Sequence, residues 1–318
     1  MDSTKEKYKK LCAENANIPF FLRYDWYNTL FTENEWGVVL EENNDEVLGF
    51  IPFYIVKKLK FSLIVPPPLT PYQGVWLNYP NNQKYTNRLS FEKEVMTSLI
   101  NKLPKSDGFT QKFHTTFTNW LPFYWKGFSQ TTKYTYVIED LSNLDNVYLE
   151  FRENIRREIR KAEKILTIEP FNDINLFYNL NIKSFTEKGI KYPISKKILK
   201  NAINYCEKNN CGKLLVAKDK LGNIHSILFY VWNDDSAYYL HGVTNSEFKT
   251  SGSMSLLLWE AIKHSKNCSK KFNFEGSMIE SIERFFRAFG GKQIQYFEIK
   301  KTSFFLSQLL KVKSFIKK

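Results

Sequence analysis

The predicted order of strands and helices in the second half of the chain constrains the fold more than any other feature. Runs with strand character alternate with longer segments whose apolar residues recur at helical spacing. The strands are predicted at 166–170, 213–218, 223–232, 236–243, 272–274 and 293–299. The helices are predicted at 173–188, 195–209, 253–267 and from 277 on. The order β-α-α-β-β-β-α-β-α-β predicts an α/β (α+β) fold with a mixed, mostly antiparallel sheet flanked by helices.

Residues 272–291 are the most informative stretch within this order. Glu275 and Gly276 follow the short strand, and Ser277 with Glu280 three residues later predicts a capping box at a helix start. A carboxylate between a strand and a helix N-terminus is a frequent place for catalysis, although the same layout also serves plain strand–helix packing. The helix should end at the glycine pair 290–291. Its buried face is expected to consist of Ile282, Phe285, Phe286 and Phe289.

The first half of the chain shows a shorter version of the pattern. Two β-rich runs at 36–40 and 46–56 flank a turn and predict a hairpin, and 61–65 predicts a third strand. The loop 66–74 contains four prolines and is therefore expected to be stiff and non-helical. A helix at 88–103 follows, and further strands are predicted near 109–117 and 133–139.

The chain carries an excess of positive charge. Its 46 basic and 33 acidic side chains give a formal net charge of +13. A helix predicted at 152–165 places isoleucines on one face and arginines and lysines around the rest. Such an excess favours an anionic partner, whether a nucleotide-type cofactor, RNA or an anionic membrane, and it is also compatible with a solvated lysine-rich surface.

Cysteine, histidine and hydropathy patterns exclude several classes of protein. Four cysteines form no CxxC pair, and four histidines show no metal-ligand spacing, so no metal site is predicted. The N-terminus has no apolar signal-peptide region and no run is long enough to span a bilayer, which predicts a cytoplasmic protein. The chain has no P-loop, Rossmann fingerprint or nucleophile elbow.

Four sequence motifs, in order along the chain, resemble those of the Fem-type peptidyltransferases and their shorter bacterial relatives in the GNAT superfamily. The motifs are LTPYQG (69–74), PFYWKGF (122–128) with TKYTYVIE (132–139), NIRREIRKAEK (154–164) and FEGSMIESIERFFRAFGG (274–291). The strand and helix order from residue 166 is also that of GNAT acyltransferases. The resemblance implies two tandem GNAT-like domains, a reduced one at 1–140 on the acceptor side and a second at 141–318 with the donor site and a basic C-terminal helix.

The resemblance also implies a place for the donor, acyl-CoA. GNAT enzymes hold its pyrophosphate on backbone amides before a helix, in a pattern that KTSGSM (249–254) matches at Lys249 and Gly252 and departs from at Met254. Ser251 and Ser253 complete the candidate loop. Because a helix N-terminus offers unpaired N–H groups and a positive dipole end, it suits an anion. The alternative is an ordinary serine-containing helix start.

Acyl transfer to an amine needs a base for the ammonium group and donors for the oxyanion. Glu275 is the first candidate base and His241 the second, although a lone strand histidine is more often structural. Fem-type enzymes place a donor-contacting lysine where this chain has Arg287, which keeps the charge but cannot lose a proton. The first domain would shape the acceptor cleft, with Tyr72 and Trp125 as candidate lining residues that are equally compatible with a core.

The sequence therefore predicts an N-acyltransferase that moves an acyl group from acyl-CoA to an amine on an amino sugar or another cell-envelope precursor. The alternative is Fem-type transfer from aminoacyl-tRNA to a peptidoglycan precursor, which the net charge favours. A second alternative is a binding protein on a GNAT scaffold. No DNA partner is predicted.

The tail 303–318 combines an apolar helical face with lysines. The face contains Phe305, Leu309, Val312 and Ile316, and the lysines stand at 311, 313, 317 and 318. Such a helix is expected to dock on its own domain, and the alternative is peripheral contact with an anionic membrane that carries a lipid-linked acceptor.

Overall fold

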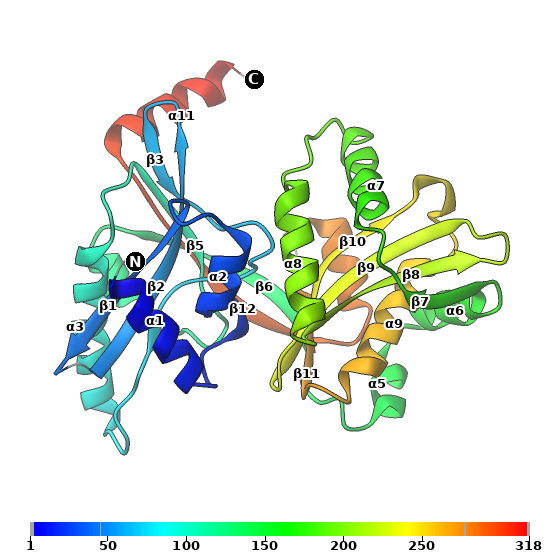
Figure 1. The fold of residues 1–318 in the computed structure, drawn as a ribbon, viewed down its shortest axis with the longest axis horizontal. Coiled ribbons are helices and arrows are strands. Elements are labelled where there is room, and N and C mark those ends of the chain that lie inside the picture. Colours follow the sequence, from blue (N-terminus) through cyan, green and yellow to red (C-terminus); the bar gives the residue numbers. More distant parts are fainter. Residues whose placement is uncertain (1–2, 45, 277, 317–318) are drawn as a thin grey trace. The chain divides into compact units, whose positions relative to one another are not determined.

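A computed structural model describes residues 3–44, 46–276 and 278–316, and it divides into two units (Figure 1). Unit 1 consists of Met1–Lys133 and Gln295–Lys318, and unit 2 of Tyr134–Ile294. The predicted boundary at residue 140 assigned the whole C-terminal segment to the second domain. The division differs because the last strand is long, and its second half, from Glu298 to Thr302, pairs antiparallel with a strand of unit 1.

The helices of unit 1 are short except for one. They are α1 (Ser3–Glu14), the 3-10 helix η1 (Phe20–Leu22), α2 (Tyr24–Leu30), α3 (Tyr85–Lys102), α4 (Leu121–Trp125) and α11 (Phe304–Ile316). The sequence did not predict α1 or α4.

The sheet of unit 1 is built on the predicted hairpin. Its strands are β1 (Trp36–Asn43), β2 (Glu46–Lys58), β3 (Phe61–Ile64), β4 (Trp76–Leu77), β5 (Gly108–Lys112) and part of β12 (Lys292–Thr302). The order is β1-β2-β3-β5-β12, with β4 beside β2. Strands β3 and β5 run parallel, and β1–β2, β2–β3, β2–β4 and β5–β12 pair antiparallel. A core of aliphatic and aromatic side chains lies between this sheet and α3.

Unit 2 contains the predicted run of elements in the predicted order. Its helices are α5 (Leu144–Glu150), α6 (Glu153–Glu163), α7 (Ile174–Thr186), α8 (Lys196–Lys208), the 3-10 helix η2 (Ser246–Phe248), α9 (Ser253–Ser265) and α10 (Glu280–Arg287). Its strands are β6 (Ser129–Ile138, shared with unit 1), β7 (Leu166–Pro170), β8 (Gly212–Asp219), β9 (Ile224–Trp232), β10 (Ser236–Thr244) and β11 (Lys271–Asn273).

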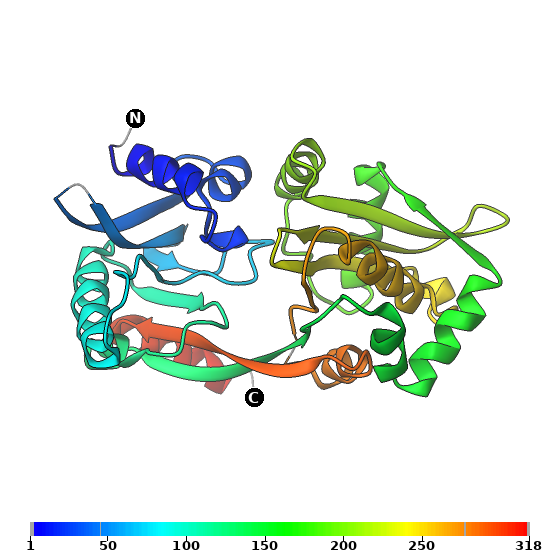
Figure 2. The ribbon, with the colours of Figure 1, turned by 90° about the horizontal axis from the view of Figure 1, so that it is seen from below.

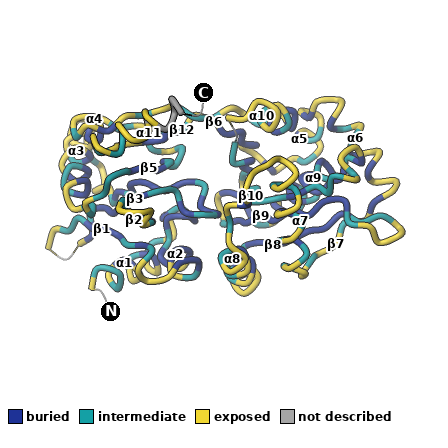
Figure 3. Tube along the Cα trace, turned by 90° about the horizontal axis from the view of Figure 1, so that it is seen from above, coloured by how far each residue is buried: buried dark blue, intermediate teal, exposed yellow. Residues whose placement is uncertain are grey.

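The sheet of unit 2 has helices on both faces (Figure 2). Its order is β6-β11-β10-β9-β8-β7, and β10 and β11 are its parallel pair. Leu215, Ala217, Leu228 and Tyr230 pack into one core with α9, α6 and α10. Val216 and Phe229, whose side chains point to the opposite face of the sheet, are also buried, which matches the contacts of α8 with β8 on that face. Strands β8 and β9 are accordingly buried or half-buried along most of their length (Figure 3). The expected mixed sheet flanked by helices is confirmed.

Helix α10 departs from its prediction at the N-terminus. It begins at Glu280 after Ile279, which makes no side-chain cap hydrogen bond, and Ser277 lies outside the described residues. Gly290 does adopt a positive φ of 72° just after the helix, as expected. Phe286 and Phe289 are buried, but Ile282 is 39% exposed, because the helix presents only one narrow apolar side to the core. In the part of the chain that the structure describes, no helix is both long and apolar enough to cross a membrane.

Candidate functional site

Strands β10 and β11 pair at one end only. Their parallel register covers Ser236–Tyr238 of β10 and Lys271–Asn273 of β11, whereas β10 continues to Thr244 beside β9. The register between β10 and β9 shifts between Tyr239 and His241, so Leu240 is the extra residue of a β-bulge. Among the described residues, no strand pairs with β10 on the β11 side beyond Tyr238. The edge of β10 beyond Tyr238 is thus left without a strand partner on this side, and a bulge there re-aims backbone N–H groups.

The loop 245–252 leads from β10 to the N-terminus of α9. Gly252 is the N-cap residue, has a φ of +76° and provides no side-chain hydrogen bond to the helix. The Ser253 N–H donates to Ser251 Oγ at 3.3 Å, and the buried Ser253 hydroxyl lies 2.7 Å from Ser226 Oγ. Lys249 is exposed, and Lys161 of α6 donates to the Thr250 carbonyl at 3.5 Å. The helix start thus has two lysines beside it. Its N-cap residue Gly252 has no side chain to cap it, and Ser251 Oγ accepts one of its backbone N–H groups.

Gly252 is required for packing between helices. A Cβ at this position would lie 2.7 Å from the Glu158 carbonyl oxygen of α6. The side chain of Glu158 also accepts a hydrogen bond from Ser255 Oγ at 2.6 Å. Its close approach to α6, together with the positive φ, explains the glycine without any ligand. Replacement of Gly252 therefore cannot separate a binding role from a folding role.

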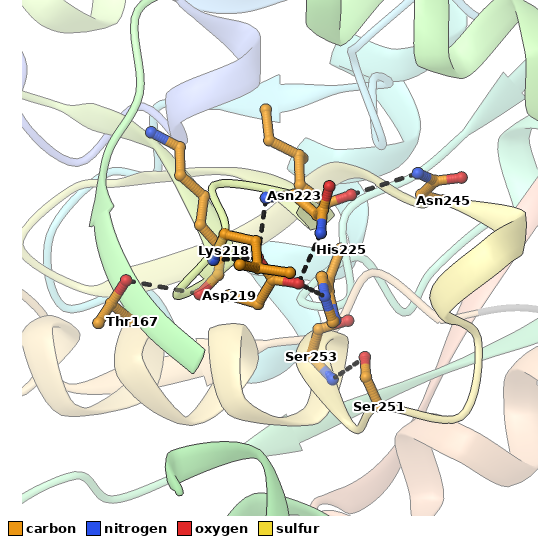
Figure 4. Close-up of polar contacts among 10 residues, drawn as sticks. Thr167, Lys218, Asp219, Asn223, His225, Asn245, Ser251 and Ser253 are labelled. Carbon is orange, nitrogen blue, oxygen red and sulfur yellow. Dashed lines mark hydrogen bonds and ion pairs between the residues drawn. The ribbon is translucent and has the colours of Figure 1, made fainter. Parts of the chain in front are cut away.

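Contacts with the β8–β9 hairpin hold the loop in place (Figure 4). The His225 ring stacks on Phe248 with centroids 3.9 Å apart, and Asn245 donates to the Ile224 carbonyl at 3.3 Å. Asp219 lies 3.4 Å from His225 Nε2. A hydrogen bond from Asn223, followed by the other donors of the turn, lowers the pKa of Asp219. The predicted anion loop is therefore fixed by a hairpin turn that the sequence did not connect with it.

His241 lies in an aromatic cluster. Its Nε2 is 2.8 Å from Tyr192 Oη, and the rings of Tyr192 and Phe177 each lie 5.7 Å from its ring. Burial lowers the pKa of His241 to about 4, so the imidazole is neutral at physiological pH. A neutral imidazole can accept a proton, but a group with so low a pKa is a weak base. Nothing in the sequence indicated that Tyr192, which follows α7, would contact His241.

Glu275 occupies a constrained turn at the end of β11. Its φ of +53° is rare for a residue with a side chain, and its Oε1 atom is buried. Asn273 Oδ1 fixes the turn by accepting both the Glu275 N–H at 2.9 Å and Thr135 Oγ1 at 2.6 Å. A Cβ on Gly276 would lie 2.1 Å from the Tyr134 carbonyl oxygen, so only glycine fits. Backbone strain of this kind is often found at functional sites.

Arg287 ends helix α10 and is held by an ion pair. Its Nε lies 2.8 Å from Glu283 Oε1. Glu283 also accepts a hydrogen bond from Tyr136, and this bond, ahead of the Arg287 charge, lowers the pKa of Glu283. The i,i+4 spacing of Glu283 and Arg287 was a signal for this pair in the sequence. The structure thus gives Arg287 a partner within its own helix.

The two candidate acceptor residues are not brought together. Tyr72 is 5% exposed and packs against Phe21 and His114. Trp125 is exposed and lines a pocket of about 800 Å³ between α3 and α4 with Arg88, Glu92 and Trp120. Tyr72 therefore belongs to the core of unit 1, whereas Trp125 can contact a ligand. The described residues contain no group of three or more His, Cys, Asp or Glu that could hold a metal ion.

Residues 150–269 match the family model of the acetyltransferase (GNAT) domain. Comparison with curated protein sequences finds no match. Among solved structures, FemX is similar with a TM-score of 0.64 and 13% identity over 93% of this chain and 96% of its own.

Two further similar structures share the fold at low identity. The C-terminal DUF2156 domain of a candidate lysylphosphatidylglycerol synthetase from Agrobacterium fabrum has a TM-score of 0.57 and 10% identity over 98% of this chain and 95% of its own. L-PGS from Bacillus licheniformis has a TM-score of 0.52 and 10% identity over 98% of this chain and 97% of its own. The chain therefore carries a GNAT acetyltransferase domain within a fold like that of FemX, as its motifs predicted.

Proposed function

We propose that this protein is an N-acyltransferase that moves an acyl group from acyl-CoA to the amine of an amino sugar or another cell-envelope precursor. One observation carries the proposal. In the GNAT domain, the edge of β10 that β11 leaves unpaired follows a bulge and leads directly into the glycine-capped N-terminus of α9. Backbone donors at a strand edge and at a helix start suit an acyl carbonyl and a phosphate, respectively.

The donor site would use backbone groups more than side chains. The first-turn N–H groups of α9, with Ser251, Gly252 and Ser253 around them, would face the pyrophosphate, and Lys249 would add charge. We add Lys161, because its contact with the Thr250 carbonyl places it beside the same loop. Arg287 is a weaker candidate, since it could reach a phosphate only by leaving Glu283.

Glu275 is the better candidate base. It would accept the proton of the ammonium group, directly or through a water, so that the free amine attacks the thioester carbon. The carbon–sulfur bond then breaks and the sulfur takes a proton. Two features support this choice: the fixed turn of Glu275 and the low pKa of His241, which makes the histidine a poorer base. His241 would then orient groups rather than take protons.

The first test is thermal stabilisation by CoA and acetyl-CoA. A ligand at 100 times its Kd stabilises a protein by about 2.7 kcal/mol, which is easily measured. The Lys161→Ala/Lys249→Ala variant should bind roughly tenfold more weakly, because it loses two charges beside the phosphates. Lys266→Ala, an exposed lysine after the other end of α9, is the matched control. Absence of any CoA response in the intact protein would contradict the proposal.

Transfer from aminoacyl-tRNA to a peptidoglycan precursor is the second candidate function. The similarity to FemX over 93% of this chain and the net charge of +13 favour it. Helix α6 offers less charge than its sequence indicates, since Arg156 and Arg160 both pair with Glu153. Stabilisation by bulk tRNA that fades with salt, without a CoA response, would support this function. If neither CoA nor tRNA stabilises the protein, a non-catalytic binding protein is favoured.

A lipid-linked acceptor fits either reaction. Peripheral contact with the inner face of the membrane through 303–318 would bring a cytoplasmic enzyme to this acceptor.

The four cysteines are free in the structure, which is compatible with a reducing compartment.

A further inference from the structure

The turn between β2 and β3 presents a leucine to solvent among lysines. Leu59 is 94% exposed and has a φ of +54°, a conformation that usually selects glycine or asparagine. Lys57, Lys58 and Lys60 are all exposed around it. A solvated turn gains nothing from an apolar tip. This turn therefore has the composition of an element that inserts an apolar residue while its charges remain at a polar surface.

Helix α11 exposes apolar side chains along the length that the structure describes. Phe304 is 79% exposed, and Phe305, Leu309, Leu310 and Val312 are between 43% and 56% exposed. Phe305, Leu309 and Val312 share a face at helical spacing. In the part of the helix whose side chains the structure describes, the expected contact with its own domain lies at the beginning, where Leu306 is close to Gly108. Ile316 carries no side-chain description, and Lys317 and Lys318 lie outside the described residues.

The turn and the helix form one surface (Figure 1). The rings of Phe61 and Phe305 lie 6.0 Å apart, and Lys60 Nζ is 4.4 Å from the centre of the Phe305 ring. The backbone of Asp107 joins the bases of both elements, since its N–H donates to the Ser62 carbonyl at 2.8 Å and its carbonyl accepts from Ser303 N–H at 2.7 Å. This surface consists of residues 57–60 with Phe304, Phe305, Leu309, Leu310 and Val312.

Charge complementarity identifies the occupant of this surface. Neither 57–60 nor 303–318 contains an acidic residue, and the helix sequence adds lysines at 311, 313, 317 and 318. A soluble protein partner would have to cover both a protruding leucine tip and an amphipathic helix. A lipid bilayer accepts apolar side chains at any point of its surface, and anionic headgroups attract nearby lysines by about 1 kcal/mol each.

We propose that the β2–β3 turn and helix α11 together bind anionic phospholipid membranes, with Leu59, Phe304 and the exposed face of α11 inserted and the turn lysines on the headgroups. The proposal extends the lipid-linked acceptor of the proposed function. Its test measures binding alone, so its failure would leave CoA binding and transfer unaffected.

The experiment is sedimentation of the full-length protein with vesicles. We expect binding to vesicles of phosphatidylcholine with 30% phosphatidylglycerol, in ~0.1 M salt, to be at least tenfold tighter than to pure phosphatidylcholine. Leu59→Ser should weaken that binding about tenfold through the loss of one inserted side chain. Leu221→Ser is the matched control, because Leu221 is 87% exposed at the tip of the β8–β9 turn in unit 2.

Two more variants separate the insertion of apolar side chains from the electrostatic attraction between lysines and anionic headgroups. Lys57→Gln/Lys58→Gln/Lys60→Gln should reduce binding to anionic vesicles by roughly 100-fold and change binding to neutral vesicles little. Phe304→Ser should weaken binding to both kinds of vesicle, because it removes insertion alone. The proposal is overturned if the intact protein does not bind anionic vesicles, or if Leu59→Ser and Leu221→Ser bind equally well.

Discussion

The two loops that follow strands β3 and β10 satisfy their polar groups in opposite ways. In unit 1, loop 66–74 turns its polar side chains inward. Buried Thr70 accepts a hydrogen bond from Trp26 Nε1 at 3.0 Å, and its carbonyl accepts one from Gln73 at 2.5 Å. The oxygen of the Gln73 side chain accepts the Lys112 N–H at 3.2 Å. This loop is part of a packed core.

The loop 245–252 in unit 2 is fixed from outside instead. Contacts of His225 and Asn245 hold it to the β8–β9 hairpin. Its last residue, the N-cap Gly252, has no side chain to cap α9, and Ser251 Oγ accepts one N–H group there. The second loop leads into a helix N-terminus, whose backbone N–H groups suit an anion, whereas loop 66–74 leads into strand β4. The comparison supports the proposal that unit 2 holds the donor.

The largest expected effect concerns the chemistry assigned to unit 2. Glu275→Gln should lower the turnover of acyl transfer at least about 100-fold, because an amide cannot accept the ammonium proton. The backbone bond to Asn273 does not involve the side chain, so the turn should survive. Steady-state kinetics with Glu280→Gln, an exposed glutamate on the next helix, as a control would measure this. Undiminished turnover in Glu275→Gln would mean that the base is another group.

A second prediction separates strain from steric exclusion in the loop of unit 2. Gly252→Ala should reduce the free energy of unfolding by about 2–4 kcal/mol, because the new methyl group meets the Glu158 carbonyl and the φ is positive. Gly222→Ala has a similar φ of 83° but nothing within 4 Å, so it should cost only about 1 kcal/mol. Urea unfolding followed by circular dichroism measures both. Equal costs would show that the contact with α6 is not what requires glycine.

Sequence patterns predicted the elements better than their partners. The hairpins and the order of elements in unit 2 were predictable because the alternation of apolar residues and the turn residues are local signals. The membership of the last strand in unit 1 was not, since it depends on pairing with β5, far away in the sequence. The same limit applies to Gly252, whose neighbour Glu158 lies on another helix.

In the candidate site, too, features with a local sequence signal were predictable, and features that depend on contacts between distant residues were not. The Glu275–Gly276 turn was predictable, because a glycine directly after a short apolar strand usually marks a turn. The neutral state of His241 was not, because its partners Tyr192 and Phe177 come from elements with no sequence link to β10. Tyr72 could not be distinguished from a cleft residue, since aromatic cores and aromatic pockets have the same composition.

A third prediction uses pH to test the role of His241. Burial holds its pKa near 4 in the folded protein, below the ordinary 6.5, so the unfolded chain binds the proton more readily. The stability from neutral His241 is present above pH 6.5 and is lost as the pH falls toward 4. This amounts to about 2 kcal/mol between pH 7 and pH 5. His241→Gln should reduce that pH dependence in urea unfolding, and an unchanged slope would show that the imidazole is not buried as neutral.

The smallest expected effect concerns the buried polar groups of loop 66–74 in unit 1. Thr70→Val removes the acceptor of the Trp26 N–H and should lower the free energy of unfolding by about 1–2 kcal/mol, because a buried donor loses its partner. Ser253→Ala in unit 2 should cost less, since Ser226 keeps its hydrogen bond to Thr244 at 2.9 Å.

If unit 1 has no donor site, the stabilisation of Thr70→Val by CoA should equal that of the unmodified protein. A CoA response lost in Thr70→Val but kept in Ser253→Ala would reverse the assignment of the two units.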